Sequence, residues 1–378
     1  MRSRRAAAAL LAFLCPLLLT GCWNYRGLDE LTVVAGIAID RAENGGYLVS
    51  FETVDLSVPV ESEGLRSLVL EAEGATLFDA IRNAKQIEPN KLYFGNTSCV
   101  ILHESLAREG LDSLFDLFVR LTEFRETISV LIARTERASD LFLPEAEANY
   151  ILSYELESIL DTDEQTTASS KEVRLYQAYN DLRTEGEALV LPVFDLITGA
   201  NGKDQPALQG LALFQGDGLA NYLPADRVKA FLAVTDDLQG GVLTADGDGD
   251  GKEQLSFEIT KAHTKQTFTP GEEVPSLRLE VALFGTLVES DVEGNLLDEA
   301  VTGGIEDMLA VRMREQVAAI LDEAKLAKQD IFGLGGALYR QKPEEWERCK
   351  DNWPEIFAAM PVELSVSVKV QSVSMLKH

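Results

Sequence analysis

The sequence predicts an α+β protein of three mixed α/β domains with largely antiparallel sheets, the last domain having one long helix packed on a sheet. Two observations support this class. Apolar runs of strand character occur in every third of the chain, and amphipathic repeats of helical spacing fall between them without a regular strand–helix alternation. A length of 378 residues, with 46% hydrophobic and 25% charged side chains, suits two to three globular domains.

The first predicted domain, residues 22–185, mixes strands and helices. Strands are expected over residues 31–39, 47–56, 67–71, 93–102 and 127–133, and the turn at 43–46 joins the first two into a hairpin. Helices are expected over residues 77–87, 111–121, 147–160 and 171–182. Thr76 suits an N-cap, and residues 161–170 are expected to form a polar linker.

The second predicted domain, residues 186–264, is small and mostly antiparallel. Its expected strands are 188–194, 207–214, 242–245 and 254–260, with a tight turn at 214–219 and a short helix at 228–234. The third, residues 265–378, is expected to have a strand at 277–289, a helix from about 305 to 328 and a strand at 362–370. Apolar and polar residues alternate along the last strand, which indicates that one of its faces is buried.

Residues 1–21 have the pattern of a lipoprotein signal peptide. Arginines at positions 2, 4 and 5 precede an apolar run of 14 residues, which is too short to span a membrane and has the length of a signal core. The run ends in Leu-Thr-Gly-Cys, which resembles a bacterial lipobox, so Cys22 is predicted to carry a diacylglycerol anchor after cleavage. The alternative is an ordinary secretory signal with a chance cysteine.

The net charge of −28 argues against a general nucleic-acid-binding protein, because a polyanion would be repelled. The same charge is repelled by anionic lipid headgroups, so attachment to a bilayer is expected to depend on the covalent anchor. Cys99 and Cys349 are the remaining cysteines of the mature chain and are expected to be two separately buried free thiols rather than one disulfide.

No catalytic, metal or cofactor site is predicted. The acidic loop at 246–251 begins like a calcium loop, but Phe257 stands where the bidentate Glu belongs, so we expect a solvated hairpin tip. The glycine-rich residues 332–336 lack the last glycine of a dinucleotide fingerprint and are predicted to be a helix-terminating turn. His103 and His263 stand in no nucleophile motif.

Several motifs follow one another along the mature chain. It opens with GCWNYRGLDEL followed by VAGIAID, continues with LYFGN at 92–96 and GLALFQGD at 210–217, and has a tail with DIFGLG at 330–335 and DNW at 351–353. In sequence and order, these motifs resemble those of the spore-germination receptor C subunits, the Ger(x)C lipoproteins. These matches span the mature chain, so the resemblance is specific; the acidic loop at 246–251 is not part of it.

The resemblance implies a non-enzymatic subunit on a diacylglyceryl anchor at Cys22, at the outer face of the cell membrane, which in a spore is the inner membrane. It implies partners, the integral-membrane A and B subunits, in a complex that responds to nutrients and triggers germination. It supplies no residue for nutrient binding. The alternative from another class is the solute-binding lipoprotein of a transporter, which would need two parallel-sheet lobes around a cleft.

The tail carries three aromatic residues at seven-residue spacing, Tyr339, Trp346 and Trp353. Pro343 and Pro354 argue against one continuous helix, so core packing is favoured over an exposed docking stripe. The third domain is nevertheless our candidate for part of the docking surface, because its long helix and its tryptophan segment supply apolar area.

Overall fold

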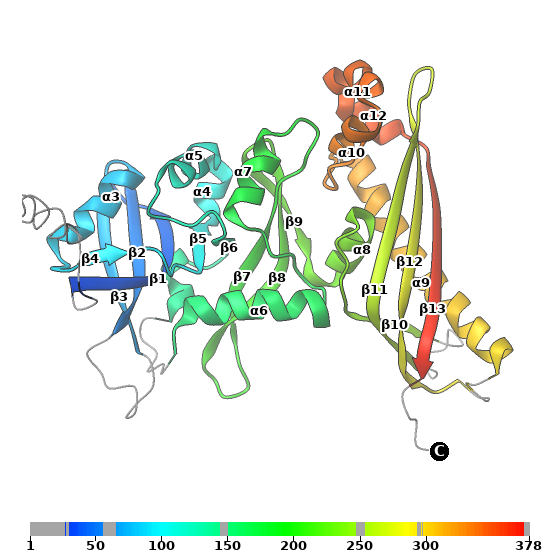
Figure 1. Cartoon of the computed structure of the whole chain (residues 1–378), viewed down its shortest axis with the longest axis horizontal. Helices are drawn as coiled ribbons and strands as arrows, with labels where there is room; N and C mark the ends of the chain where they lie inside the picture. The colour runs from blue at the N-terminus through cyan, green and yellow to red at the C-terminus, as the bar shows by residue number, and fades with distance from the viewer. Residues whose placement is uncertain are drawn as a thin grey trace, which may run out of the picture.

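The computed structural model describes residues 27, 30–55, 66–143, 150–246, 254–292, 296 and 298–373. These residues form two sheets, which follow one another along the long axis of the molecule (Figure 1). The mixed α/β class and the long helix on a sheet are thereby confirmed.

Nine strands make up the first sheet. They are β1 (Leu31–Arg41), β2 (Tyr47–Asp55), β3 (Arg66–Gly74), β4 (Lys91–Tyr93), β5 (Cys99–His103), β6 (Ser129–Ala133), β7 (Val190–Thr198), β8 (Asp204–Gln215) and β9 (Gly218–Pro224). Their order is β3-β2-β1-β5-β6-β7-β8-β9, with β4 beside β1. Antiparallel pairs form both ends of this order, whereas β1, β5, β6 and β7 are parallel.

The parallel centre of this sheet differs from the largely antiparallel arrangement expected from the sequence. Helices α4 (Glu104–Glu109) and α5 (Asp112–Arg120) connect β5 to β6 as a crossover, which is the connection that parallel neighbours require. Strands β5 and β6 are short and almost completely buried. Unbroken apolar runs of this kind are typical of parallel strands covered on both faces. The apolar sequences of β5 and β6 were therefore the signal by which the parallel pairing could have been predicted.

Helices cover both faces of the first sheet. One face packs against α3 (Leu77–Asn83), α4, α5 and α7 (Leu175–Arg183), and the other against η3 (Ala138–Phe142) and α6 (Leu152–Thr166) (Figure 1). The Thr76 side chain accepts a hydrogen bond from the Asp79 N–H, which confirms the predicted N-cap. Cys99 lies in this core and Cys349 in that of the second sheet; both are free and buried, as predicted.

Two elements of the first region differ from the prediction. The strand expected at 93–102 is broken between β4 and β5, where residues 94–98 leave the strand conformation. The helix expected at 147–160 is α6, which begins at Leu152 and continues to Thr166 into the expected polar linker. Buried Leu152, Leu156 and Leu160 repeat every four residues along its sheet-facing side, so the packing extends the helix.

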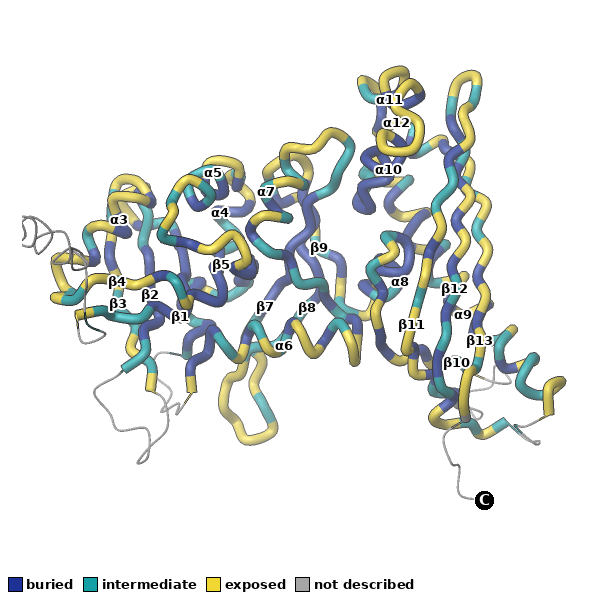
Figure 2. Tube along the Cα trace, viewed as in Figure 1, coloured by how far each residue is buried: buried dark blue, intermediate teal, exposed yellow. Residues whose placement is uncertain are grey.

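The second sheet has the order β10-β11-β12-β13. Its strands are β10 (Val242–Asp246), β11 (Gln254–Thr269), β12 (Ser276–Ser290) and β13 (Val362–Val373). The long helix α9 (Glu299–Leu326) packs on it, beginning six residues earlier than expected. Burial alternates along the middle of β13 as predicted (Figure 2). Strand β13 is parallel to β12.

Residues 186–264, the predicted middle domain, contribute to both sheets. Strands β7, β8 and β9 extend the first sheet, and α8 (Ala225–Thr235) leads from them to β10 and β11 of the second. The boundaries at 185/186 and 264/265 stay predictions about folding units.

The tail folds as three short helices and one 3-10 turn. They are α10 (Leu334–Gln341), α11 (Pro343–Cys349), η4 (Lys350–Asn352) and α12 (Trp353–Ala359), and Pro343 and Pro354 each stand in a first turn. Trp346 and Trp353 are 4% and 8% exposed, so their predicted core packing is confirmed, while Tyr339 is 43% exposed. The two tryptophans therefore supply no docking surface. Within the described residues, no helix is both long and apolar enough to cross a membrane.

Candidate functional site at the junction of the two sheets

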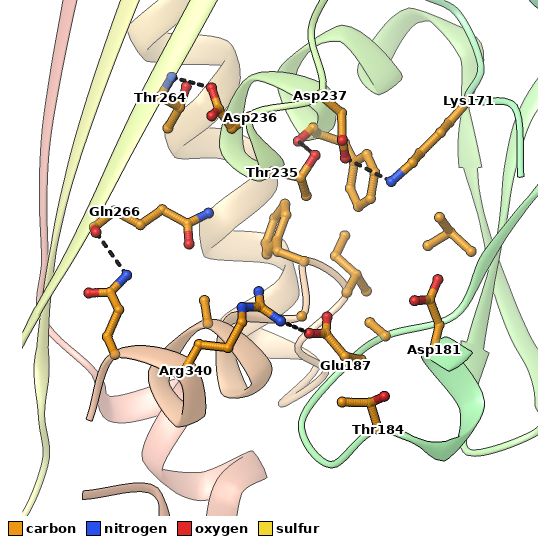
Figure 3. A pocket seen from close by; sticks show the side chains of 18 residues that line it. Lys171, Asp181, Thr184, Glu187, Thr235, Asp236, Asp237, Thr264, Gln266 and Arg340 are labelled. Carbon is orange, nitrogen blue, oxygen red and sulfur yellow. Dashed lines mark hydrogen bonds and ion pairs between the residues drawn. The ribbon is translucent and has the colours of Figure 1, made fainter. Parts of the chain in front are cut away.

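A polar pocket of about 520 Å³ lies where the two sheets meet. Its walls come from α7, the segment leading into β7, the C-terminal end of α8, strand β11 and helix α10 (Figure 3). The ionisable side chains that line it are Lys171, Asp181, Glu187, Asp236, Asp237 and Arg340. Four acidic groups against two basic ones give the pocket a negative balance.

Two ion pairs connect the walls of the pocket. Lys171 Nζ lies 2.7 Å from Asp237 Oδ2, joining the segment before α7 to the end of α8. Arg340 of α10 pairs with Glu187, which precedes β7. The backbone adds a third connection, because the Gly336 N–H donates to the Gly186 carbonyl at 2.7 Å. These contacts tie the first sheet to the elements that pack on the second.

Asp236 is held by the wall of the second sheet. It is the C-cap of α8 in the left-handed conformation, with φ 65°. Its carboxylate accepts the Thr264 N–H of β11, and its Oδ1 lies 3.2 Å from His263 Nδ1. Asp236 is therefore occupied in fixing α8 to β11.

Asp181 is the remaining carboxylate of the pocket. In the described part of the chain it forms no hydrogen bond or ion pair, and Figure 3 shows it facing the pocket apart from both pairs. The pKa of Asp181 is raised to about 6, chiefly by burial; nearby Lys171 and Arg340 lower it, and Glu187 and Asp237 raise it. Chemically, the arrangement offers one uncompensated acidic group to a small cationic ligand.

The glycine-rich residues 332–336 form one rim of the pocket. They do not end α9, which stops at Leu326, so the predicted helix-terminating turn is wrong; they begin α10, with Gly333 as its N-cap at φ 67°. The start of α10 binds an internal anion, because Asp330 accepts the Gly335 N–H at 2.8 Å and the Phe332 N–H at 3.2 Å. The carboxylate of Asp330 thus takes the place that a bound phosphate would need.

The residues singled out in the sequence do not come together in this pocket. Cys22 and most of the acidic loop, residues 247–251, lie outside the described residues. His103 is the N-cap of α4 and bonds to Ser105 and to the Thr135 carbonyl. His263 lies outside the lining residues but contacts Asp236. Among the described residues no group of three or more His, Cys, Asp or Glu side chains is placed to hold a metal ion.

Replacing Asp181 with Asn is expected to stabilise the protein at neutral pH. The folded-state pKa of about 6 exceeds the ordinary 3.8, so ionisation opposes folding, and stability falls as pH rises through this window. We expect a gain of about 1–2 kcal/mol for Asp181→Asn at neutral pH, vanishing below about pH 4. Chemical denaturation across pH measures it, with the exposed Asp161→Asn as control. An equal gain at both ends of the pH range would contradict the assignment.

The chain matches two family models. They are described as "Spore germination protein N-terminal domain", over residues 24–196, and "Spore germination B3/ GerAC like, C-terminal", over residues 209–374. Spore germination protein KC of Bacillus subtilis (strain 168) is 26% identical over 390 residues, covering 98% of this chain and 95% of the relative. Spore germination protein B3 of the same organism is 23% identical and covers 95% of each chain.

A solved structure has the same fold. The crystal structure of the GerBC protein aligns with a TM-score of 0.59 at 19% identity, covering 89% of this chain and 97% of that one. The two family models match in succession along nearly the whole chain, which makes it a spore germination protein. The chain belongs to the family of spore-germination receptor C subunits, as its motifs predicted.

Proposed function

We propose that this protein is the lipid-anchored, non-enzymatic C subunit of a nutrient-germinant receptor that triggers bacterial spore germination. The observation that supports the role is the match of both family models, in order, over residues 24–196 and 209–374. In this proposal the chain is held by Cys22 at the outer face of the cell membrane, the inner membrane of the spore. It assembles there with the integral-membrane A and B subunits.

Docking rather than catalysis is supported by the contents of the junction pocket. Its two basic groups are taken up by ion pairs, and the carboxylate of Asp236 is bonded to β11. The remaining group, Asp181, has no nucleophile or basic partner within hydrogen-bonding distance in the described chain. A tether that confines the protein to the membrane raises its effective concentration towards membrane partners, so weak contacts suffice for assembly.

Cys22→Ala is expected to abolish lipid attachment. The substitution removes the thiol that would receive the diacylglycerol, and a chain this acidic has little affinity of its own for anionic lipid. Metabolic labelling with a fatty-acid analogue should label the wild type and leave Cys22→Ala unlabelled and uncleaved. Persistent label on Cys22→Ala would disprove the anchor, and Cys15→Ala, which lies within the signal, is the matched control.

Partnership with the A and B subunits is tested by co-purification. A tagged full-length chain, extracted from spore membranes in mild detergent, should bring both subunits with it. Cys22→Ala should recover less of both, because the tether no longer concentrates the chain at the membrane. Recovery of neither subunit with the wild type would contradict the proposal.

A solute-binding lipoprotein is the second candidate, and the observation that favours it is the 520 Å³ pocket between the sheets. Against it, the second sheet is antiparallel except for the pair β12–β13, so it is not a parallel lobe. Thermal melting of the chain from Trp23 onward, with a panel of amino acids and sugars, separates the two. A solute-binding protein gains stability with its ligand, and a subunit that acts through docking alone does not.

A further inference from the structure

One end of the first sheet carries exposed apolar and basic side chains. Ile87, directly after the 3-10 turn η2 (Ala84–Gln86), is 57% exposed, and Tyr93 of β4 is 41% exposed. Lys85 and Lys91 are exposed beside them, and we call these four residues the β4-end surface. The stretch 85–93 holds two lysines and one glutamate in a chain whose net charge is −28.

The β4-end surface is built rigidly against the beginning of β1. Strand β4 pairs with the first residues of β1, placing Leu31 opposite Lys91. Thr32 Oγ1 donates to Glu88 Oε1 at 2.9 Å, which occupies the one carboxylate of the stretch. The Lys85 ammonium donates to the carbonyls of Glu88, Pro89 and Asn90 and so closes the turn that presents Ile87.

The position of this surface in the molecule follows from the topology. The start of β1, η2 and β4 lie at one end of the long axis, and the second sheet lies at the other (Figure 1). Leu31 is nine residues after Cys22. An extended chain advances at most about 3.3–3.6 Å per residue, so an anchor at Cys22 keeps Leu31 within about 30 Å of the lipid.

We propose that the β4-end surface rests in the headgroup region of the phospholipid bilayer. This rests on the proposed anchor at Cys22, which holds the surface within reach. Its chemistry fits that environment, because Tyr is enriched at membrane interfaces, a Lys side chain such as that of Lys91 covers apolar surface with its stem while its ammonium stays in water, and Ile supplies apolar area for burial. Residues 85–93 contain two lysines and one glutamate, whose carboxylate is hydrogen-bonded, so this stretch is repelled less by anionic headgroups than the chain as a whole.

A labelled cysteine at position 87 tests the proposal. Cys99 and Cys349 are buried and Cys22 would be blocked by lipid, so Ile87→Cys supplies one accessible thiol for a fluorophore. Val311→Cys on α9, where the native side chain is 49% exposed, is the matched control. The full-length lipidated protein is reconstituted in vesicles of phosphatidylethanolamine and phosphatidylglycerol, with and without brominated lipid, and flotation is measured on the same samples.

We expect brominated lipid to quench the Ile87→Cys label by about half or more and to leave the Val311→Cys label unchanged, as insertion to headgroup depth requires. If the protein floats but brominated lipid quenches the two labels to the same extent, the surface assignment alone is overturned. Protein that does not float overturns the anchor and the surface with it. Quenching that appears only when the A and B subunits are added assigns the surface to a protein partner and overturns the lipid assignment.

Discussion

Trp353→Ala is expected to lower the free energy of unfolding by about 3–5 kcal/mol, the usual cost of removing a buried tryptophan. The indole meets Trp346 edge-on with ring centroids 5.3 Å apart and also packs on Phe357. Its Nε1–H donates to Asp330 Oδ2 at 3.0 Å. The substitution therefore leaves a cavity and removes one hydrogen bond from the carboxylate at the start of α10. Urea denaturation followed by circular dichroism measures the loss.

Two further variants separate packing from the hydrogen bond. Trp353→Phe keeps most of the ring volume and loses the donor, so we expect it to cost about 1–3 kcal/mol. Tyr339→Ala on the exposed side of α10 should change stability by less than about 0.5 kcal/mol. If Trp353→Ala unfolded as the wild type does and instead weakened recovery of the A and B subunits, the tail would be a docking element.

Glu52→Ala is expected to destabilise the first sheet by at least about 3 kcal/mol, because it leaves buried donors without an acceptor. Glu52 of β2 is fully buried. Its two carboxylate oxygens accept the N–H groups of Leu152 and Ser153, each at 2.8 Å, and so cap the beginning of α6. Burial raises the pKa of Glu52, while these hydrogen bonds oppose the shift.

The comparison for Glu52→Ala is Glu73→Ala on the exposed side of β3, which should change stability by less than about 0.5 kcal/mol. Hydrogen exchange adds a local readout. The amides of Leu152 and Ser153 should lose protection in Glu52→Ala before the amides of β5 do. Equal unfolding free energies for the two variants would show that Glu52 does not support α6.

Elements with a clear period were predictable from the sequence. The alternation along β13 and the apolar stripe of α9 each follow from one face lying on a core, so pattern and structure agree. The beginning of α6 was not predictable, because its cap comes from Glu52, 100 residues earlier in the chain. The break between β4 and β5 was equally hidden, since residues 94–98 lie within a run of strand character.

The junction pocket could not be predicted from local motifs. Lys171 and Asp237 are 66 residues apart, and Glu187 and Arg340 are 153 residues apart. Each is an ordinary surface charge in its own segment, and only the packing of α8 and α10 beside the start of β7 brings them together. The role of Asp330 was not predictable either. The glycine pattern at 332–336 gave no indication that the Asp330 carboxylate accepts the N–H groups at the start of α10.

The core of the second sheet does not stop at the junction. Val190, Leu211 and Leu223 of the first sheet belong to the same buried cluster as α8, α9 and the inner face of β12. The two sheets therefore share one continuous hydrophobic core along the long axis of the molecule (Figure 1). A movement that separates the sheets must expose apolar side chains of this cluster to water, which costs free energy in proportion to the area exposed.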